Sequence, residues 1–298
     1  TTLGSKEGLA NLASAITAPG DLVLVPNPTY PIHAYGFMIA GGTLRHIPSL
    51  ATGNFNPEDY LRNLSRAVMH SIPKPIALVV SFPSNPTAQL CDLTFYRELV
   101  RFALKHSIWI LSDLAYAEIY FDDNPPPSIL QVDGAKEIAI EFTSMSKTFS
   151  MAGWRVGFAV GNKHLINALT RIKSYLDYGA FTPVQVAAVE ALNGPPSYIE
   201  QIRNEYRRRR DTLILSMARA GWKIPEPPAT MFAWAPLPKK FETMGSMEFA
   251  KLLMIKASVA VAPGIGFGEY GEGYVRIGLV ENEHRIRQAA KSIRKLIN

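Results

Sequence analysis

Ser144-Met-Ser-Lys-Thr-Phe-Ser-Met-Ala-Gly-Trp-Arg-Val-Gly157 is the stretch that decides how this chain folds. It follows Glu137-Ile-Ala-Ile-Glu-Phe-Thr143, an apolar run that is typical of a buried strand. Lys147 therefore lies at the end of a predicted strand, next to two serines and ahead of Arg155. A basic loop that closes a strand is the simpler interpretation. The two serine hydroxyls and the arginine between glycines favour another interpretation, in which Lys147 forms a covalent bond to a ligand beside a phosphate site.

A reactive amine next to a bound phosphate is the chemistry of pyridoxal 5′-phosphate (PLP). The aldehyde of this cofactor forms a Schiff base with an enzyme lysine. The sequence therefore predicts PLP on Lys147, as a hypothesis that its structural context has to support.

Length and composition limit the alternatives. The 298 residues are enough for one or two domains, and a hydrophobic fraction of 47% supplies a sizeable core. One cysteine, Cys91, excludes an internal disulfide, and no metal site is predicted. The expected setting is a reducing, cytoplasmic one. No run approaches the roughly 18 apolar residues that span a bilayer, so no membrane association is expected.

The net charge of +6 raises the question of nucleic-acid binding. Much of it is concentrated in Arg207-Arg-Arg-Arg210, within a helical pattern that also contains Glu200, Glu205 and Asp211. We expect a solvated helix face there, because no aromatic residues interleave with the basic ones to form a binding groove. A basic chain also suits small anions such as phosphate and carboxylates.

The chain alternates predicted strands and helices up to about residue 194. This pattern predicts an α/β fold with a mostly parallel sheet between helices, followed by a smaller C-terminal α+β domain. We expect a boundary at Asn193-Gly-Pro-Pro, giving domains 1–194 and 195–298. The predicted strands are 21–26, 76–82, 108–113, 137–143, 156–161, 231–234 and 273–278; the predicted helices are 7–17, 93–106, 196–221 and one after Asn282.

Polar side chains follow three successive predicted strands. Asn85 comes after one strand, Asp113 and Tyr116 after the next, and the Ser144–Lys147 group after a third. Open α/β sheets bind ligands beyond the carboxyl ends of their strands, so these groups are expected to converge. Asp113 alone would be read equally well as a helix cap. In a shared site, its carboxylate would keep a pyridine nitrogen protonated.

The remaining candidates have ordinary alternatives. Asn85 precedes Pro86 as turn residues often do, yet its amide and the Tyr116 hydroxyl suit a ring oxygen. Gly4-Ser-Lys-Glu-Gly8 opens a predicted helix, where the Ser5 and Lys6 amides could bind an anion. Tyr30 is either a core residue or a ring that stacks on the cofactor. Strand alternation places Arg276 on the face of Tyr274, available to a substrate carboxylate or to solvent.

These motifs together resemble the class I/II aminotransferases of PLP fold type I, over nearly the whole chain. By this resemblance, Lys147 carries the Schiff base, Asp113 pairs with the pyridine nitrogen, and Arg276 binds the α-carboxylate with Asn85. Ring contacts are implied for Tyr30, Asn85 and Tyr116, and phosphate contacts for Ser5, Lys6, Ser144, Ser146 and Arg155. The motifs that carry the resemblance are Asn85-Pro-Thr, Ser112-Asp113-x-x-Tyr116, Ser144-x-Ser-Lys147, Gly153-x-Arg155-x-Gly157 and Arg276.

The resemblance also implies an activity. The segments that begin at Gly4, Asn27 and Gly264 look most like alanine-forming glutamate–pyruvate transaminases, with aspartate and LL-diaminopimelate aminotransferases close behind. Transfer of an amino group between a small L-amino acid (alanine, aspartate or glutamate) and a 2-oxo acid is expected, in a homodimer with shared sites. The alternatives are a PLP-dependent lyase or synthase of the same fold, or a PLP-binding inactive or regulatory module.

Two features depart from the family pattern. Ala88 stands where many members have glycine after Asn-Pro-Thr. The chain also begins at the expected phosphate loop, whereas members carry about ninety more residues before it, the size of a small domain. A partial sequence, or a shortened and less active protein, is therefore expected.

Overall fold

The computed structural model describes residues 1–49 and 55–297. Within them, six strands form one sheet in the order β2-β1-β3-β4-β5-β6, and only the β5–β6 pair is antiparallel. The mostly parallel α/β sheet predicted from the sequence is therefore confirmed. The strands are β1 (Leu22–Asn27), β2 (Thr43–Pro48), β3 (Pro75–Ser81), β4 (Trp109–Asp113), β5 (Ala139–Ser144) and β6 (Gly157–Gly161).

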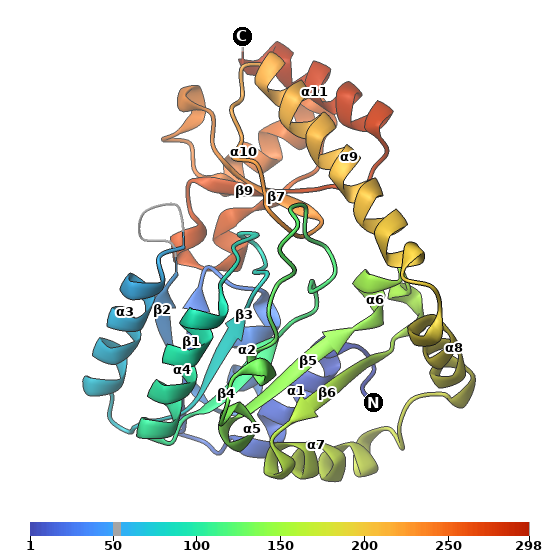
Figure 1. Ribbon diagram of the computed structural model, residues 1–298. Helices are drawn as coiled ribbons and strands as arrows, with labels where there is room; N and C mark the ends of the chain where they lie inside the picture. Colours follow the sequence, from blue (N-terminus) through green and yellow to red (C-terminus); the bar gives the residue numbers. More distant parts are fainter. Residues whose placement is uncertain (50–54, 298) are drawn as a thin grey trace.

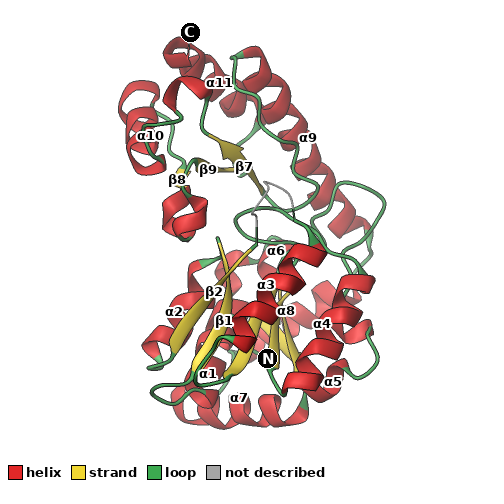
Figure 2. Ribbon diagram, turned by 90° about the vertical axis from the view of Figure 1, so that its left-hand side faces the viewer, coloured by secondary structure: helices red, strands yellow, loops and turns green. Residues whose placement is uncertain are grey.

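Helices cover both faces of this sheet (Figures 1 and 2). Apolar residues of α1, α2 and α7 pack on one face, and those of α3, α4 and α5 pack on the other. The central strands are therefore buried on both sides, which explains their near-continuous apolar sequences. The helices are α1 (Ser5–Ile16), α2 (Pro31–Ile39), α3 (Pro57–Met69), α4 (Leu93–His106), α5 (Ala135–Ile138) and α7 (Lys163–Leu176).

A smaller part lies above the carboxyl ends of the large sheet in Figure 1. It contains a three-stranded antiparallel sheet in the order β7-β9-β8, packed against helices around the buried Trp222 and Phe249. The predicted α+β character of this region is confirmed. Its elements are α9 (Ser197–Arg219), β7 (Phe232–Pro236), α10 (Ser246–Leu252), a π-helical turn (Leu253–Ala257), β8 (Ala262–Pro263), β9 (Tyr274–Gly278) and α11 (Glu283–Ile297).

Most predicted element bounds agree with the structure to within two residues, and α4 agrees at both ends. The strand predicted from Glu137 is wrong at its start, because Ala135–Ile138 forms a helical turn. Gly134 adopts φ 80° and begins that turn, and Ile138 packs into the core that α4 covers. Pairing with β4 starts only at Ala139, opposite Ile110.

The basic run on α9 is less solvated than predicted. Arg210 forms ion pairs with Asp211 and Glu226 and lies over the Phe121 ring. Arg209 donates hydrogen bonds to the Leu279 and Val280 carbonyl oxygens. Part of this charge therefore serves to fix α9 against the rest of the protein.

The expected boundary at residue 194 falls between α8 (Thr182–Asn193) and α9. α9 runs from the level of the large sheet up to the small one (Figure 1). Over the residues that the structure describes, no helix combines the length and the apolar character that crossing a bilayer requires.

Candidate active site

Every site residue predicted from the sequence lines one cavity of about 320 Å³, here called the central pocket. This volume is in the range of small-molecule sites. The pocket lies between the carboxyl ends of the large sheet's strands and the small sheet. The predicted residues that line it are Ser5, Lys6, Tyr30, Asn85, Asp113, Tyr116, Ser144, Ser146, Lys147, Arg155 and Arg276.

The fold explains this convergence. Tyr30 precedes α2 just beyond β1, Asn85 follows β3, and Asp113 ends β4. Ser144 ends β5 and caps α6 (Met145–Thr148), the short turn that contains Lys147. These strands run parallel, so their carboxyl ends meet at one edge of the sheet.

One end of the pocket has the donors that an anion needs. Ser5 and Lys6 lie in the first turn of α1, where backbone N–H groups have no partner within the helix. The buried Ser146 hydroxyl has no hydrogen-bond partner among the described residues. Arg155, which adopts φ 54°, is held by hydrogen bonds of 2.9 Å to the Leu3 and Ala152 carbonyl oxygens. This donor set suits a phosphate group.

Two glycines allow these groups to approach one another. Gly4 adopts φ 86°, and a Cβ there would lie 2.5 Å from Arg155 Nη2. Gly157 pairs with Thr2 of the segment before α1, and a Cβ on it would lie 2.6 Å from the Thr143 carbonyl oxygen and 3.1 Å from the Ser5 nitrogen. The anion end therefore depends on close backbone packing.

Replacing Gly157 by alanine is expected to lower the free energy of unfolding by about 1–3 kcal/mol, because backbone atoms cannot yield to the new methyl group. Binding of a phosphate-containing ligand should weaken as α1 is displaced. Gly153→Ala is the matched control from the same motif, since nothing lies within 4 Å of a Cβ at that position. Thermal unfolding and ligand titration check this, and equal behaviour of the two variants would contradict it.

Asp113 is buried and has well-defined partners. Its Oδ2 lies 2.9 Å from His33 Nε2, and its Oδ1 accepts a hydrogen bond from the Ala115 N–H at 3.2 Å. His33 Nδ1 in turn lies 2.7 Å from the Thr29 hydroxyl. No role was predicted for His33 from the sequence. The sequence offers one indication of this contact: Thr29 and His33 are four residues apart, just after β1.

Lys147 is mostly buried, and its surroundings disfavour its charge. Burial lowers the pKa of Lys147, the nearby Arg155 and Arg276 charges lower it further, and Asp113 opposes them. Burial, and then Asp113, raises the pKa of Tyr116, so its hydroxyl stays protonated. Lys147 Nζ lies 5.9 Å from the centre of the Tyr116 ring. The pocket therefore holds an amine that loses its proton readily beside a phenol that retains its own.

Arg276 reaches the pocket from β9, which confirms the predicted alternation: Val275 and Ile277 are buried on the opposite face. Its guanidinium carbon lies 5.0 Å and 4.7 Å from the Phe232 and Phe267 ring centres. Arg276 Nη1 donates to Asn85 Oδ1 at 2.6 Å. The guanidinium is thus held next to two aromatic rings, where it can bind a planar carboxylate.

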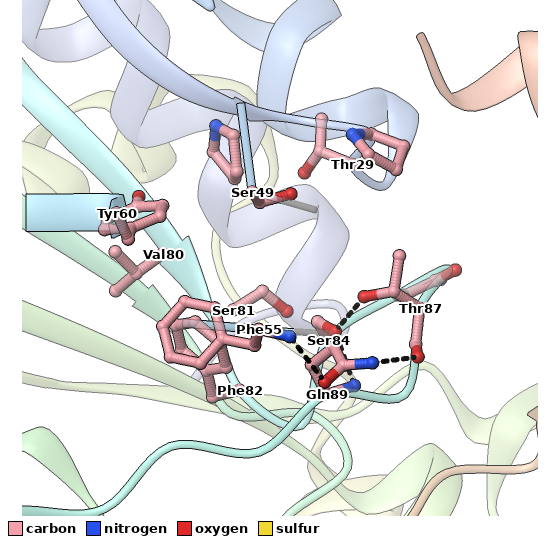
Figure 3. A pocket seen from close by; sticks show the side chains of 13 residues that line it. Thr29, Ser49, Phe55, Tyr60, Val80, Ser81, Phe82, Ser84, Thr87 and Gln89 are labelled. Carbon is pink, nitrogen blue, oxygen red and sulfur yellow. Dashed lines mark hydrogen bonds between the residues drawn. The ribbon is translucent and has the colours of Figure 1, made fainter. Parts of the chain in front are cut away.

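The turn after β3, which contains Asn85, is held by hydrogen bonds of Ser84 and Gln89, two residues labelled in Figure 3. The Ser84 hydroxyl accepts from the Gln89 N–H at 2.8 Å, and Gln89 Oε1 accepts from the Phe55 N–H at 3.1 Å. The cavity in this view measures about 20 Å³, too small for an amino acid. Ala88 adopts φ 58°, which explains why glycine suits that position: alanine costs about 1 kcal/mol there.

Apart from Arg276, the side chains of the upper wall of the pocket were not predicted from the sequence. Several of its side chains come from the small sheet or its flanks, and Phe232 packs edge-on against Tyr116 at 5.3 Å between ring centres. Only the arrangement of the two sheets brings them there. The additional lining residues are Ala115, Ala152, Met231, Phe232, Gly278 and Val280.

Comparison with known proteins identifies this arrangement. Residues 1–293 match the family "Aminotransferase class I and II". The chain belongs to that family. This aminotransferase is 64% identical over 297 residues to the putative aminotransferase AatC of Rhizobium meliloti, covering 100% of the chain and 72% of AatC. It is 50% identical to the glutamate–pyruvate aminotransferase AlaC of Escherichia coli, covering 99% of the chain and 70% of AlaC.

A solved structure has the same fold. The aminotransferase superimposes on apo-BacF of Bacillus subtilis with a TM-score of 0.92 and 35% identity, covering 100% of this chain and 74% of that one. The family depends on PLP, and the resemblance inferred from the sequence is confirmed at the level of family, fold and aminotransferase activity.

Proposed function

We propose that this aminotransferase binds PLP through Lys147 and transfers the amino group of a small L-amino acid, with L-alanine as the preferred donor, to a 2-oxo acid. The observation that carries the proposal is the composition of the central pocket. It places a lysine of lowered pKa, an anion-binding helix end, a buried carboxylate and a carboxylate-binding arginine around one cavity.

The pocket residues fit PLP group by group. Ser5, Lys6, Ser144, Ser146 and Arg155 would hold the phosphate. Asp113, itself positioned by His33, would face the pyridine nitrogen. Tyr30 would stack on the ring, and Tyr116 and Asn85 would contact its oxygen. When bound, PLP supplies an aldehyde that condenses with amines and a ring that takes up the electron pair left at the substrate α-carbon.

The protein's own groups then carry out positioning and proton transfer. Arg276 binds the α-carboxylate together with Asn85, which fixes the α-carbon near Lys147. Lys147 Nζ, whose lowered pKa favours the neutral amine, takes the α-proton of the substrate and later returns it. The Asp113 carboxylate stabilises positive charge on the facing nitrogen. Phe232 and Met231 line the upper side and present apolar surface to the substrate.

Among the described residues, Arg155 and Arg276 are the only arginines that line the pocket, so no further arginine there would select a donor with a second carboxylate. Arg155 already donates to two carbonyl oxygens, and Arg276 is reserved for the α-carboxylate. The naming of AlaC as a glutamate–pyruvate aminotransferase supports alanine as the donor and 2-oxoglutarate as the acceptor.

The test is steady-state turnover of L-alanine with 2-oxoglutarate, compared with L-aspartate, L-glutamate with pyruvate, and LL-diaminopimelate. We expect pyruvate and glutamate to form in equal amounts, and only when the 2-oxo acid acceptor is present. Pyruvate formation without an acceptor would contradict amino transfer, and a stronger response to LL-diaminopimelate would contradict the substrate assignment.

Changing Arg276 to glutamine is expected to raise the KM for L-alanine about 100-fold, because a charged hydrogen bond to the carboxylate is lost. The amount of cofactor bound per chain should stay the same, since Arg276 does not contact the cofactor in this proposal. Titration of alanine in both proteins measures the effect. A wild-type KM in the variant would show that another group binds the carboxylate.

We further propose that the protein forms a homodimer through α8 and the segment before it. α8 packs on the turn that carries Lys147, through Ala188 against Met145 and Met151. Seven large apolar side chains of this region are more than half exposed, and apolar side chains gathered on a surface are typical of an interface. These residues are Tyr175, Leu176, Tyr178, Phe181, Val186, Val189 and Leu192.

Phe181→Asp combined with Val189→Asp is expected to convert the dimer to a monomer, because each charge would be buried without a partner in the interface. Met254→Asp, at an exposed position in the small part, is the control. Light scattering after size-exclusion chromatography gives the mass. A monomeric wild type, or a dimeric double variant, would contradict this interface.

The domains 1–194 and 195–298, and a cytoplasmic location, remain predictions.

A further inference from the structure

A buried lysine lies beneath the anion end of the pocket and has no part in the proposed chemistry. Lys173 on α7 is 7% exposed. Its Nζ lies 2.7 Å from Glu7 Oε1 and 2.5 Å from Asp177 Oδ2. Burying a lysine is costly unless its charge is compensated, and here two carboxylates compensate it. Burial lowers the pKa of Lys173, but its hydrogen bonds to Asp177 and Glu7 outweigh this and raise it.

Glu7 connects this lysine to the first turn of α1. Its Oε2 accepts a hydrogen bond of 2.7 Å from the Leu3 N–H. The Leu3 carbonyl oxygen accepts one of 2.9 Å from Arg155 Nη2. Leu3 is therefore held from both sides, by the Glu7 carboxylate and by a guanidinium that lines the pocket. The position of Leu3 and Gly4 sets the direction of the Ser5 and Lys6 amides that follow.

The charges around the first turn of α1 also indicate a role for Lys173. Glu7 lies within one turn of Ser5, so an uncompensated carboxylate would repel a phosphate bound at those amides. The ammonium of Lys173, which it shares between Glu7 and Asp177, offsets part of that charge, and together with Asn11 it keeps the Glu7 side chain in place. Helices α1 and α7 lie side by side on one face of the sheet (Figures 1 and 2), so Lys173 reaches Glu7 without leaving the core.

We propose that Lys173 is a positioning residue for phosphate: by holding Glu7 it fixes the Leu3–Gly4 turn and with it the anion-binding end of α1. This inference rests on the proposed function, in which that end binds the phosphate of PLP. Lys173 does not touch the cofactor, so its effect is confined to the phosphate contacts.

The experiment compares PLP with pyridoxal, which has the same ring and aldehyde but no phosphate. Dissociation constants of both are measured by absorbance titration of wild type, Lys173→Met and Lys173→Arg. We expect Lys173→Met to bind PLP about tenfold more weakly, with pyridoxal binding unchanged. Lys173→Arg keeps the charge and should stay close to wild type. Lys251→Met is the matched control, since Lys251 pairs with Glu248 on the exposed side of α10.

An equal loss for both ligands, or no loss for PLP, would overturn the inference. If Lys173→Met does not fold, Glu7→Ala provides the test, because it removes the acceptor for the Leu3 N–H while Lys173 keeps Asp177. The same PLP-selective loss is expected, and an unchanged ratio of the two constants would contradict it. A wild type that binds PLP no better than pyridoxal would instead overturn the proposed phosphate site itself.

Discussion

Replacing Lys147 by alanine is expected to reduce transamination at least about 10³-fold, because the variant loses both the amine that bonds to the cofactor and the group that moves the α-proton. PLP should still bind through its phosphate contacts, but without a covalent bond. Turnover of L-alanine with 2-oxoglutarate measures the first effect, and mass spectrometry after borohydride reduction measures the second.

The lowered pKa of Lys147 gives this prediction a pH dependence. An amine reacts in its neutral form, which predominates above its pKa, so a lowered pKa extends the reactive range of Lys147 to lower pH. The wild type should therefore form the covalent bond at pH values where exposed lysines are still protonated. Lys251→Ala, at the surface, should behave as wild type. Substantial turnover by Lys147→Ala would contradict the assignment.

Replacing Asp113 by asparagine is expected to lower kcat about 10²–10³-fold, with PLP still bound to Lys147. The substitution keeps the shape of the side chain but removes the negative charge that would face the pyridine nitrogen. A loss of this size is typical when a buried group that stabilises the charge developing in the transition state is removed. The hydrogen bond of 2.9 Å between Asp113 and His33 shows that the carboxylate is fixed in place.

The measurement is the rate of the half-reaction with L-alanine in wild type and Asp113→Asn, followed by the loss of visible absorbance. Asp122→Asn, in the exposed part of the same loop, is the control. If Asp113→Asn reacts within a few-fold of wild type, Asp113 does not pair with the ring nitrogen.

The sequence predicted the lower half of the site because parallel strands impose a simple rule. Asn85, Asp113 and Lys147 each follow an apolar strand, and carboxyl ends of parallel strands meet at one edge. No side-chain contact had to be known. The bounds of α4 were also predicted correctly, because both of its ends depend on local interactions. Asp92 caps the start of the helix, and Ser107, at φ 55°, ends it.

Apart from Arg276, which the family resemblance supplied, the upper half could not be predicted, because it depends on how the small sheet sits above the large one. Phe232 contacts Tyr116 across that gap, and no spacing in the sequence encodes it. His33 was missed because a buried histidine in an apolar helix has no distinctive pattern. Glu137 was assigned to a strand because periodicity does not distinguish a short helical turn from the start of a strand.

The most direct test of this account is to add PLP to the purified protein, reduce it with borohydride and locate the modified residue by peptide mass spectrometry. The account predicts one cofactor per chain, attached to Lys147. Modification spread over exposed lysines, or concentrated on a lysine other than Lys147, would contradict it.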